Sequence, residues 1–375
     1  MYYTRLKAAG VKTSRVTDHV NHQWIKESPK EILALLRKEV AEHPRVGRVC
    51  NVMLPPWNAK GDNITEDTAA VAAALAACSP GGTVLLPAGH VFYIRPVRLP
   101  SYSTLQIDGD IAGWRDIQTW PNSTTKRCPT TPYGLPRNKI ITAPKKEALL
   151  WAANGTHIVV KGKGTVDGGG WQWWPLRKLP GDYWHNCRPI LMEFGSRHGD
   201  VSGVSDIQVE GITLKDSPFW TFSGSGLLRA VISSVHVTTS GCGYDEAPNT
   251  DGFNIQGNDI LIEDSSVHNG DDCVPIFPPS KNITVRNMTC ECGNGMVPCI
   301  WPPFSVPGDG GDIEDVLFDG ATFKNTKTVV AIKALAGFVG TASNITYRNF
   351  VLDRVNGAAI MINMFGQGLE SGGLF

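Results

Sequence analysis

The chain has 375 residues, of which 42% are hydrophobic and 19% are charged, a composition typical of a folded globular protein. Thirty-five lysines and arginines balance thirty-five aspartates and glutamates, which offers no overall positive field for nucleic acid or an anionic membrane. The apolar runs are too short to span a bilayer, and no signal peptide is visible at the N-terminus. A small molecule or a neutral polymer suits this charge balance better as a partner, and a local basic patch for an acidic ligand stays open.

Two helices are predicted near the start of the chain. A capping box that begins at Ser28 predicts a helix as far as about His43. The second helix, Asp67–Ala77, is rich in alanine and stops before Pro80. We expect this second helix to cover the open end of the fold that follows. Residues 1–48 are interpreted as an N-terminal extension that carries the first helix.

A short phrase returns along the rest of the chain: a polar or small residue, Ile or Val, any residue, an apolar residue, any residue, and then Asn, Asp or Gly. Its alternation predicts strands, and forty glycines supply turns between them. A repeating unit of roughly two dozen residues favours a parallel β-helix over a sandwich or barrel. We therefore predict an all-β domain over residues 49–375. The copies begin at His157, Asp206, Asp259, Asn282, Asp315 and Asn344, with a looser copy at Ala230.

Two glycine-bearing acidic clusters stand out in the second half of the chain. The stretch NTDGF contains Asp251, and NGDDC contains Asp271 and Asp272. Neighbouring carboxylates raise the pKa of one group and leave the others ionised, which places a proton donor beside a base, as glycoside hydrolysis requires. The alternative is that these aspartates only cap turns. That alternative leaves the repulsion within the adjacent pair unexplained unless a cation or a substrate uses it.

The spacing of these residues predicts that they stack on one face. Asp251 precedes Asp272 by slightly more than twenty residues, and Asp272 precedes Asn294 by a similar number. Each step is about one coil, so the three should lie on successive rungs about 4.8 Å apart. Lys333 falls one rung further along once the loop Trp301–Asp312, rich in proline and glycine, is discounted.

The chain resembles the polygalacturonase-like glycoside hydrolases of family 28 over residues 49–367. The resemblance implies a right-handed, single-stranded parallel β-helix of the pectin-lyase type that cleaves pectin or a polygalacturonate-like polysaccharide, with no cofactor and no metal. The stretches that carry it are GDNITEDTAAVAAALAAC, GGTVLLPAG, GTVDGGGWQWW from Gly164, RPILMEF from Arg188, LKDSPFWTF from Leu214, NTDGF and NGDDC.

The resemblance also implies roles for particular residues. Asp271 corresponds to the general acid that protonates the leaving oxygen. Asp251 and Asp272 correspond to the pair that activates water, with inversion at the anomeric carbon. Cys273 and Cys290 match the family's disulfide across this coil.

Two positions depart from the family pattern. Asn294 stands where the family usually has histidine, and Ala331 stands where it has the arginine that helps to hold the galacturonate carboxylate. Asn294 can hydrogen-bond but cannot carry charge, and Lys333 is left as a point charge without the arginine fork. Asn249, Asn294 and Lys333 are the candidate substrate-binding residues.

The departures keep several functions open. The first choice is hydrolysis of α-1,4-galacturonosidic bonds, with a weak preference for action at chain ends. The alternatives are a β-helical polysaccharide-binding protein with impaired catalysis, a rhamnogalacturonan-type hydrolase, and a Ca²⁺-dependent lyase. A metal site made from Cys290, Cys292 and Cys299 is disfavoured.

The cysteines and glycosylation sequons favour an extracellular monomer. Nine cysteines are many for a cytosolic enzyme, and their odd number leaves at least one unpaired in a monomer. Sequons also arise without any glycosylation, simply because asparagine is common in turns. The sequons lie at Asn63, Asn122, Asn154, Asn282, Asn287 and Asn344.

The chain also stops early for the family, so the last rung is expected to present a bare edge that needs further residues.

Overall fold

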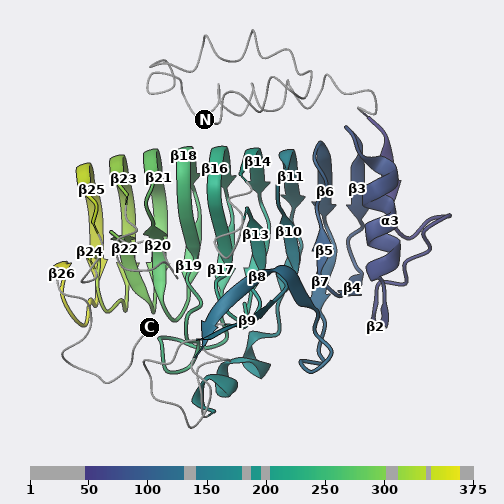
Figure 1. Ribbon diagram of the computed structural model, residues 1–375, viewed down its shortest axis with the longest axis horizontal. Coiled ribbons are helices and arrows are strands. Elements are labelled where there is room, and N and C mark those ends of the chain that lie inside the picture. The colour runs from purple at the N-terminus through teal and green to yellow at the C-terminus, as the bar shows by residue number, and fades with distance from the viewer. Residues whose placement is uncertain are drawn as a thin grey trace.

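The computed structural model describes residues 47–130, 141–179, 187–195, 203–300, 311–334 and 339–363. The expected helix at 28–43, most of the loop 301–312 and the end of the chain lie outside these residues. Twenty-four strands form one sheet in which nearly every neighbour lies in the next coil, and the printed registers within it are parallel. The sheet winds through successive coils that stand side by side in Figure 1. The predicted parallel β-helix is therefore confirmed.

Three ladders of strands run the length of the β-helix. The ladder that matters for function, called the first ladder here, begins near the N-terminal end of the domain and passes through every later coil. It contains β5 (Val97–Arg98), β10 (Leu150–Ala152), β13 (Met192–Phe194), the start of β16 (Phe222–Ser233), the start of β18 (Phe253–Glu263), β20 (Asp272–Ile276), β22 (Asn294–Pro298), β24 (Val330–Lys333) and β26 (Ile360–Asn363).

The other two ladders complete the wall of each coil. In the later coils they merge into long strands that turn a corner without a break. The second ladder contains β1 (Val49–Asn51), β3 (Thr83–Leu86), β6 (Ser103–Ile107), β11 (Thr156–Gly162), β14 (Val204–Glu210), the ends of β16 and β18, β21 (Ser280–Glu291), β23 (Ile313–Lys324) and β25 (Ala342–Asp353). The third contains β2 (Asp62–Glu66), β4 (Val91–Ile94), β7 (Asp110–Gly113), β12 (Thr165–Asp167), β15 (Thr213–Lys215), β17 (His236–Thr238), β19 (Ser266–His268) and the ends of β21, β23 and β25.

The repeated phrase begins at a corner of the coil. Its first residue has a positive φ in every exact copy, between 52° and 59°, and so does Arg229 just before the looser copy. Asparagine and aspartate tolerate this left-handed conformation better than other residues with a side chain. The polar first letter of the phrase is thus a requirement of the backbone. Neighbouring corners are also linked, since the Asn282 amide donates to Asp259 Oδ1 at 2.7 Å.

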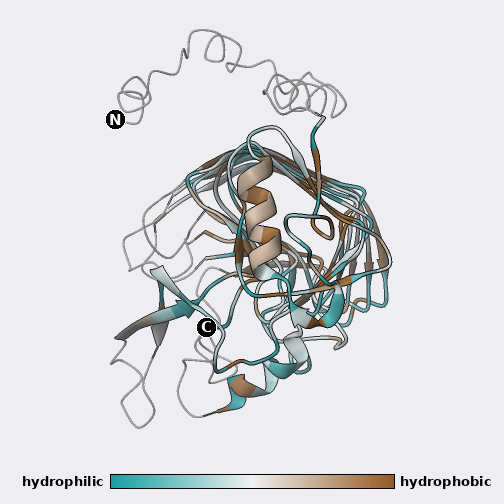
Figure 2. Ribbon diagram, turned by 90° about the vertical axis from the view of Figure 1, so that its right-hand side faces the viewer, coloured by the Kyte–Doolittle hydropathy of each residue, from teal (hydrophilic) through white to brown (hydrophobic). Residues whose placement is uncertain are grey.

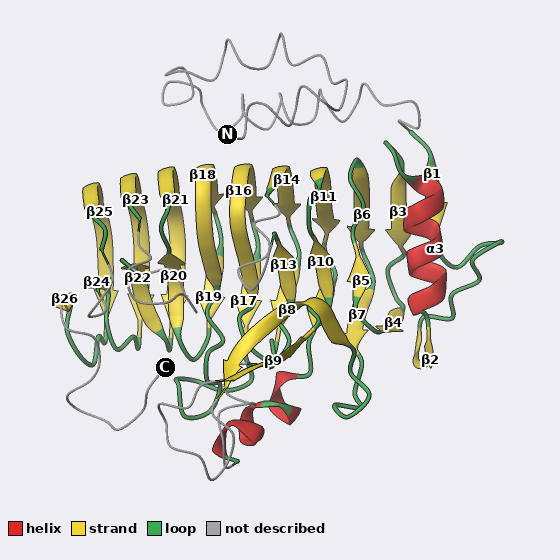
Figure 3. Cartoon of the chain, in the orientation of Figure 1, coloured by secondary structure: helices red, strands yellow, loops and turns green. Residues whose placement is uncertain are grey.

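The helix α3 (Thr68–Cys78) lies at the N-terminal end of the β-helix. It buries Val71, Ala74, Leu75 and Cys78, and a disulfide joins Cys78 to Cys50 on β1. Figure 2, which views the molecule from this end, draws the helix across the first coils, and Figure 3 shows how little other helix the described residues contain. The predicted helix thus exists, whereas its role in stabilising the end of the fold stays a prediction. No helix among the described residues could cross a membrane.

Two excursions leave the coils near the middle of the chain. The first is an antiparallel hairpin of β8 (Asn122–Thr130) and β9 (Ile141–Lys146), which a Cys128–Cys187 disulfide ties to the chain before β13. The second consists of the short helices η2 (Gly170–Gln172) and η3 (Trp174–Lys178), which follow β12. Both excursions lie on the same side of the coils in Figure 1. They flank the residues that the sequence marks for catalysis.

Candidate active site

The three aspartates lie where the chain enters the first ladder. Asp272 opens β20 and pairs in register with Asn294, which opens β22. One rung earlier, the Gly252 amide next to Asp251 donates to the carbonyl of Asp272 at 2.9 Å. Asp251, Asp272 and Asn294 therefore occupy three successive rungs, which is the arrangement that their spacing predicts.

The carboxylates form a compact and largely buried group, called the acid cluster here. One oxygen from each of Asp251, Asp271 and Asp272 lies within 4.8 Å of the other two. Asp251 and Asp272 are each 6% exposed, whereas Asp271 is half-buried. Burial, followed by the charges of its two neighbours, raises the pKa of Asp251 well above its ordinary value. Burial and the Asp272 charge raise the pKa of Asp271 to about 7.

Among the described residues, one lysine forms an ion pair with this cluster. The Lys333 ammonium donates to both carboxylate oxygens of Asp272, at 3.0 and 2.9 Å. Burial opposes the charge on Lys333, but Asp272 beside it holds the pKa of the ammonium above its usual range. The raised pKa values of the cluster therefore belong to Asp271 and Asp251, the two carboxyls that Lys333 does not contact. The same oxygens would suit a hard divalent cation, although Lys333 already neutralises one of them.

Two asparagines hold the Asp271 carboxylate from opposite sides. Asn294 donates to Oδ1 at 3.3 Å, and Asn249 donates to Oδ2 at 3.4 Å. The backbone amide of Asp272 also donates to Oδ1, at 3.0 Å. The amide of Asn294 thus takes over the hydrogen bond that the resemblance assigns to a histidine. Asn249 and Asn294 thus meet at the proposed acid, and their role in binding substrate stays a prediction.

A buried arginine holds one of these asparagines in place. This arginine is not among the site residues expected from the sequence. The Arg188 guanidinium donates to Asn249 Oδ1 at 2.8 Å and to the carbonyl oxygens of Pro218 and Pro248 at 2.7 and 3.1 Å. Its side chain is fully buried, which lowers the pKa of Arg188 to about 9. Arg188 is the first residue of RPILMEF, one of the stretches that carry the family resemblance. The sequence thus marked this position, but only the structure shows that Arg188 contacts Asn249.

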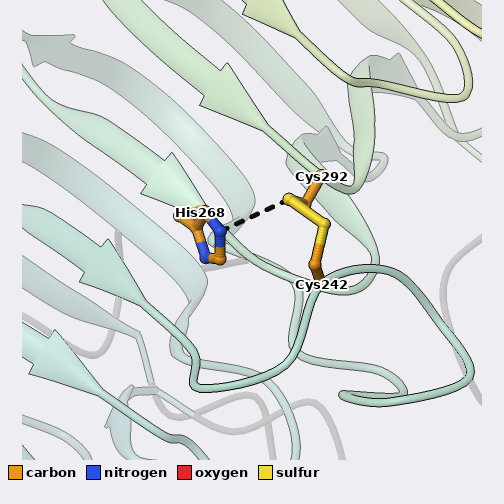
Figure 4. Close-up of side chains that lie close together, drawn as sticks. All are labelled: Cys242, His268 and Cys292. Atoms are coloured by element: carbon orange, nitrogen blue, oxygen red, sulfur yellow. Dashed lines mark hydrogen bonds between the residues drawn. A yellow bond between two sulfur atoms is a disulfide. The ribbon is translucent and has the colours of Figure 1, made fainter.

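Two disulfides fasten the cluster. Cys273 follows Asp272 and is bonded to Cys290, while Cys242 is bonded to Cys292, two residues before Asn294. Figure 4 shows the second disulfide with the His268 imidazole, whose Nε2 lies 3.3 Å from the Cys292 sulfur. With Cys290 and Cys292 both in disulfides, the disfavoured metal reading of these cysteines loses two of its three ligands. The ninth cysteine, Cys299, is buried and forms no disulfide.

Ala331 is covered, which corrects the expectation that it faces the substrate. Its side chain is fully buried and packs in an apolar cluster with Phe277, Val297 and Cys299. Val297 and Ala331 follow the same parallel register as Met296 and Val330, so this apolar surface continues along the rungs. The position for which the family resemblance implies an arginine is therefore part of a packed surface in this chain.

The hairpin covers the rung next to Asp251. The Lys145 ammonium on β9 lies 4.5 Å from the ring centre of Phe219 and 5.9 Å from that of Trp220. Trp220 precedes Thr221, whose amide donates to the carbonyl of Asp251 at 2.9 Å. The hairpin and the acid cluster are therefore separated by about one rung.

Comparison with known proteins agrees with this geometry. The family model for glycosyl hydrolases family 28 matches residues 138–367. A probable polygalacturonase of Arabidopsis thaliana is 28% identical over 340 residues, which are 87% of this chain and 67% of that protein. Endo-xylogalacturonan hydrolase A of Aspergillus tubingensis is 26% identical over 318 residues, 82% of this chain and 70% of that protein. This chain thus spans about two thirds of the length of these relatives.

A solved structure shows the same fold. The hyperthermoactive exopolygalacturonase from Thermotoga maritima superposes with a TM-score of 0.68 at 20% identity, over 88% of this chain and 80% of that chain. At this identity the match speaks for the fold alone. The family model, in contrast, covers more than half of the sequence, including all three aspartates. The chain belongs to glycosyl hydrolases family 28 and is a glycoside hydrolase.

Proposed function

We propose that the protein hydrolyses α-1,4-galacturonosidic bonds in pectin or a related acidic cell-wall polysaccharide. One observation carries the proposal: Asp271, whose pKa is raised to about 7, lies beside Asp272, whose carboxyl oxygens both accept hydrogen bonds from the Lys333 ammonium. An acid and a base with separated proton affinities on one face are what cleavage of a glycosidic bond requires. The relatives named for polygalacturonan and xylogalacturonan support a uronate polymer as the substrate.

The reaction uses the three aspartates in different steps. Asp271 is the most exposed of them and donates its proton to the glycosidic oxygen as the bond to the anomeric carbon breaks. Asp272 accepts a proton from the water that attacks this carbon, and Asp251 lies beside it as the other member of the pair. Asp251 Oδ1 is buried and accepts no hydrogen bond from any described residue. Attack from the face opposite the leaving group inverts the anomeric configuration.

The hairpin favours action at a chain end. A polymer that lies along the first ladder towards the N-terminal rungs meets Lys145 and Trp220 about one rung from Asp251. One rung of about 4.8 Å leaves room for roughly one sugar in this direction. An enzyme blocked in this way releases short products from an end, which supports the exo preference.

The cysteine chemistry supports secretion. Four disulfides join eight of the nine cysteines, as expected for a protein that matures in an oxidising compartment. We propose that the protein acts outside the cell, as a monomer, on an insoluble or gelled polysaccharide.

The test is a substrate panel with the purified protein. Polygalacturonate, xylogalacturonan and rhamnogalacturonan are incubated separately, and products are followed by reducing ends and by ultraviolet absorbance. Reducing ends without absorbance, released mainly as monomer or dimer from polygalacturonate, are expected. An absorbing double bond would indicate elimination, and bound but uncleaved polymer would favour a binding protein. Proton NMR of the first product reports whether the anomeric configuration inverts.

A further inference from the structure

The uronate carboxylate lacks its usual partners in this chain. The family resemblance implies an arginine at the position of Ala331, but Ala331 is buried among apolar side chains. The Lys333 ammonium donates to both oxygens of Asp272 and its side chain is only 12% exposed. A polymer with a carboxylate on each sugar still needs a cation that can accept it. The structure offers one on a different element.

Arg177 is the cation in question. It lies near the end of η3, and the short helices are fixed to the coil that precedes the acid cluster. At the start of η3 the Trp174 indole donates to the carbonyl of Ser217 at 3.0 Å, and at the start of η2 the Gly170 amide donates to that of Asp216 at 2.6 Å. The Arg177 guanidinium lies 4.5 Å from the centre of the Tyr244 ring and hydrogen-bonds to the Tyr244 side chain. A guanidinium has five N–H donors, so one hydrogen bond to Tyr244 leaves others for a planar acceptor.

Tyr244 connects Arg177 to the proposed acid. The Tyr244 hydroxyl accepts a hydrogen bond from Asn249 at 3.4 Å, and Asn249 donates to Asp271 at 3.4 Å. Two side chains therefore separate the guanidinium from the carboxyl that protonates the leaving oxygen. Burial and the nearby Asp271 raise the pKa of Tyr244, so its ring stays neutral beneath Arg177.

The Arg177 guanidinium has no carboxylate partner among the described residues and is therefore available to bind an anionic ligand. Among the described residues no carboxylate forms an ion pair with it, and it is half-buried. The other nearby cations are committed elsewhere, since Arg188 and Lys145 are fully buried against carbonyls and rings. Arg177 is thus the described cation beside Asp271 that combines partial exposure with a fixed position.

We propose that Arg177 binds a uronate carboxylate of the substrate and determines the preference for charged over esterified galacturonan. This inference rests on the proposed function and names the residue that replaces the missing arginine. Tyr244 acts as the positioning residue that holds the guanidinium plane. The guanidinium that binds the carboxylate thus lies on η3 and not on the first ladder.

The experiment compares Arg177→Gln and Arg177→Lys with Lys178→Gln as the matched control. Lys178 is the next residue of η3, is exposed, and loses the same charge on substitution. On polygalacturonate, Arg177→Gln should raise KM by about tenfold or more with kcat within about threefold, as for a group that binds ground state and transition state alike. Arg177→Lys should keep part of the affinity. Lys178→Gln should match the parent.

A second substrate and a binding measurement make the outcomes distinct. On fully methyl-esterified pectin, which lacks the carboxylate, Arg177→Gln and parent should have equal kcat/KM. An equal loss on both substrates, or an unchanged KM on polygalacturonate, would overturn the proposal. Calorimetric titration with trigalacturonate reads the same contact without turnover: parent should bind it more tightly than Arg177→Gln. If the parent cleaves none of the polymers yet shows this difference, the proposed hydrolysis fails while the role of Arg177 stands; no binding by the parent would sink the role itself.

Discussion

Two buried groups of charged side chains in this protein differ in how well their carboxylates are matched by cations. The first joins the hairpin to the coils and is called the hairpin cluster here: Lys126 on β8 lies 2.7 Å from a carboxylate oxygen of Glu147 and 2.7 Å from one of Glu193. Lys145 lies near the same glutamates, but burial lowers the pKa of its ammonium to about 7. Burial opposes the charge on Lys126 too, but the two glutamates raise the pKa of its ammonium above the ordinary value. Each glutamate is thus matched by a direct contact with the Lys126 ammonium.

The acid cluster, a few rungs away, has three carboxylates and one lysine in contact with them. Here the shortage of positive charge appears as raised pKa values at Asp251 and Asp271. A matched buried cluster joins two parts of a fold, whereas an unmatched one stores a proton that chemistry can use. The difference separates a structural ionic group from a catalytic one without reference to relatives.

The largest expected effect is the loss of turnover when the unmatched cluster is neutralised. Asp271→Asn or Asp272→Asn should lower kcat on polygalacturonate by about a thousandfold, because proton donation or acceptance in the transition state is removed. Substrate affinity should stay within about tenfold. Asp319→Asn, which changes an exposed carboxylate on β23, serves as the control. Unfolding of either site variant in place of slowed turnover would support the turn-capping explanation.

The second effect should appear in the matched cluster as lost stability. Lys126→Met leaves Glu147 and Glu193 buried without their cation, which should lower the free energy of unfolding by about 3 to 5 kcal/mol. Denaturant unfolding measures the change. Replacing both glutamates by glutamine in the same protein should recover much of it. A loss below about 1 kcal/mol for Lys126→Met would mean that the hairpin cluster is not a structural group.

The third prediction concerns the covered position beside the acid cluster. Ala331→Arg should cost about 1 to 3 kcal/mol of stability, because a long charged side chain must enter the packed group of Phe277, Val297 and Cys299. Restoring the family's residue should therefore bring no gain in kcat/KM on polygalacturonate. A stable and more active variant would show that this surface opens to substrate.

The smallest effect is a pH dependence of stability. The pKa of Asp271 is raised to about 7 in the folded protein, from an ordinary value of 3.8. The folded state therefore holds this proton more tightly than the unfolded chain, and the stability it brings is present in full below pH 3.8 and is lost as pH rises through 7. Asp271→Asn, which is neutral throughout, should melt about 2 °C higher than the parent at pH 8 and at the same temperature near pH 4. Equal melting at both pH values would contradict the raised pKa.

The coil and the acid cluster follow from the sequence because both depend on a regular spacing. The repeated phrase and the step of about one coil between Asp251, Asp272 and Asn294 are properties of the chain itself. Arg188 and Arg177 could not be placed in this way. They reach Asn249 and Tyr244 through folds of the chain outside the repeat, and such contacts leave no periodic trace. The burial of Ala331 was missed for a related reason, since alternation within a strand says nothing of what covers its outer face.

The left-handed corners of the coils decide where glycosylation sequons can be trusted. Asn282, Asn287 and Asn344 each have a positive φ and stand first in a sequon. The amide nitrogen that would carry a glycan already donates to an aspartate of the preceding corner, at 2.7, 2.5 and 2.7 Å respectively. A sugar attached there would break the link between adjacent coils. These sequons are therefore by-products of the corner conformation. The repeat that builds the β-helix places asparagine at these corners, and so produces sequons whether or not the protein is glycosylated.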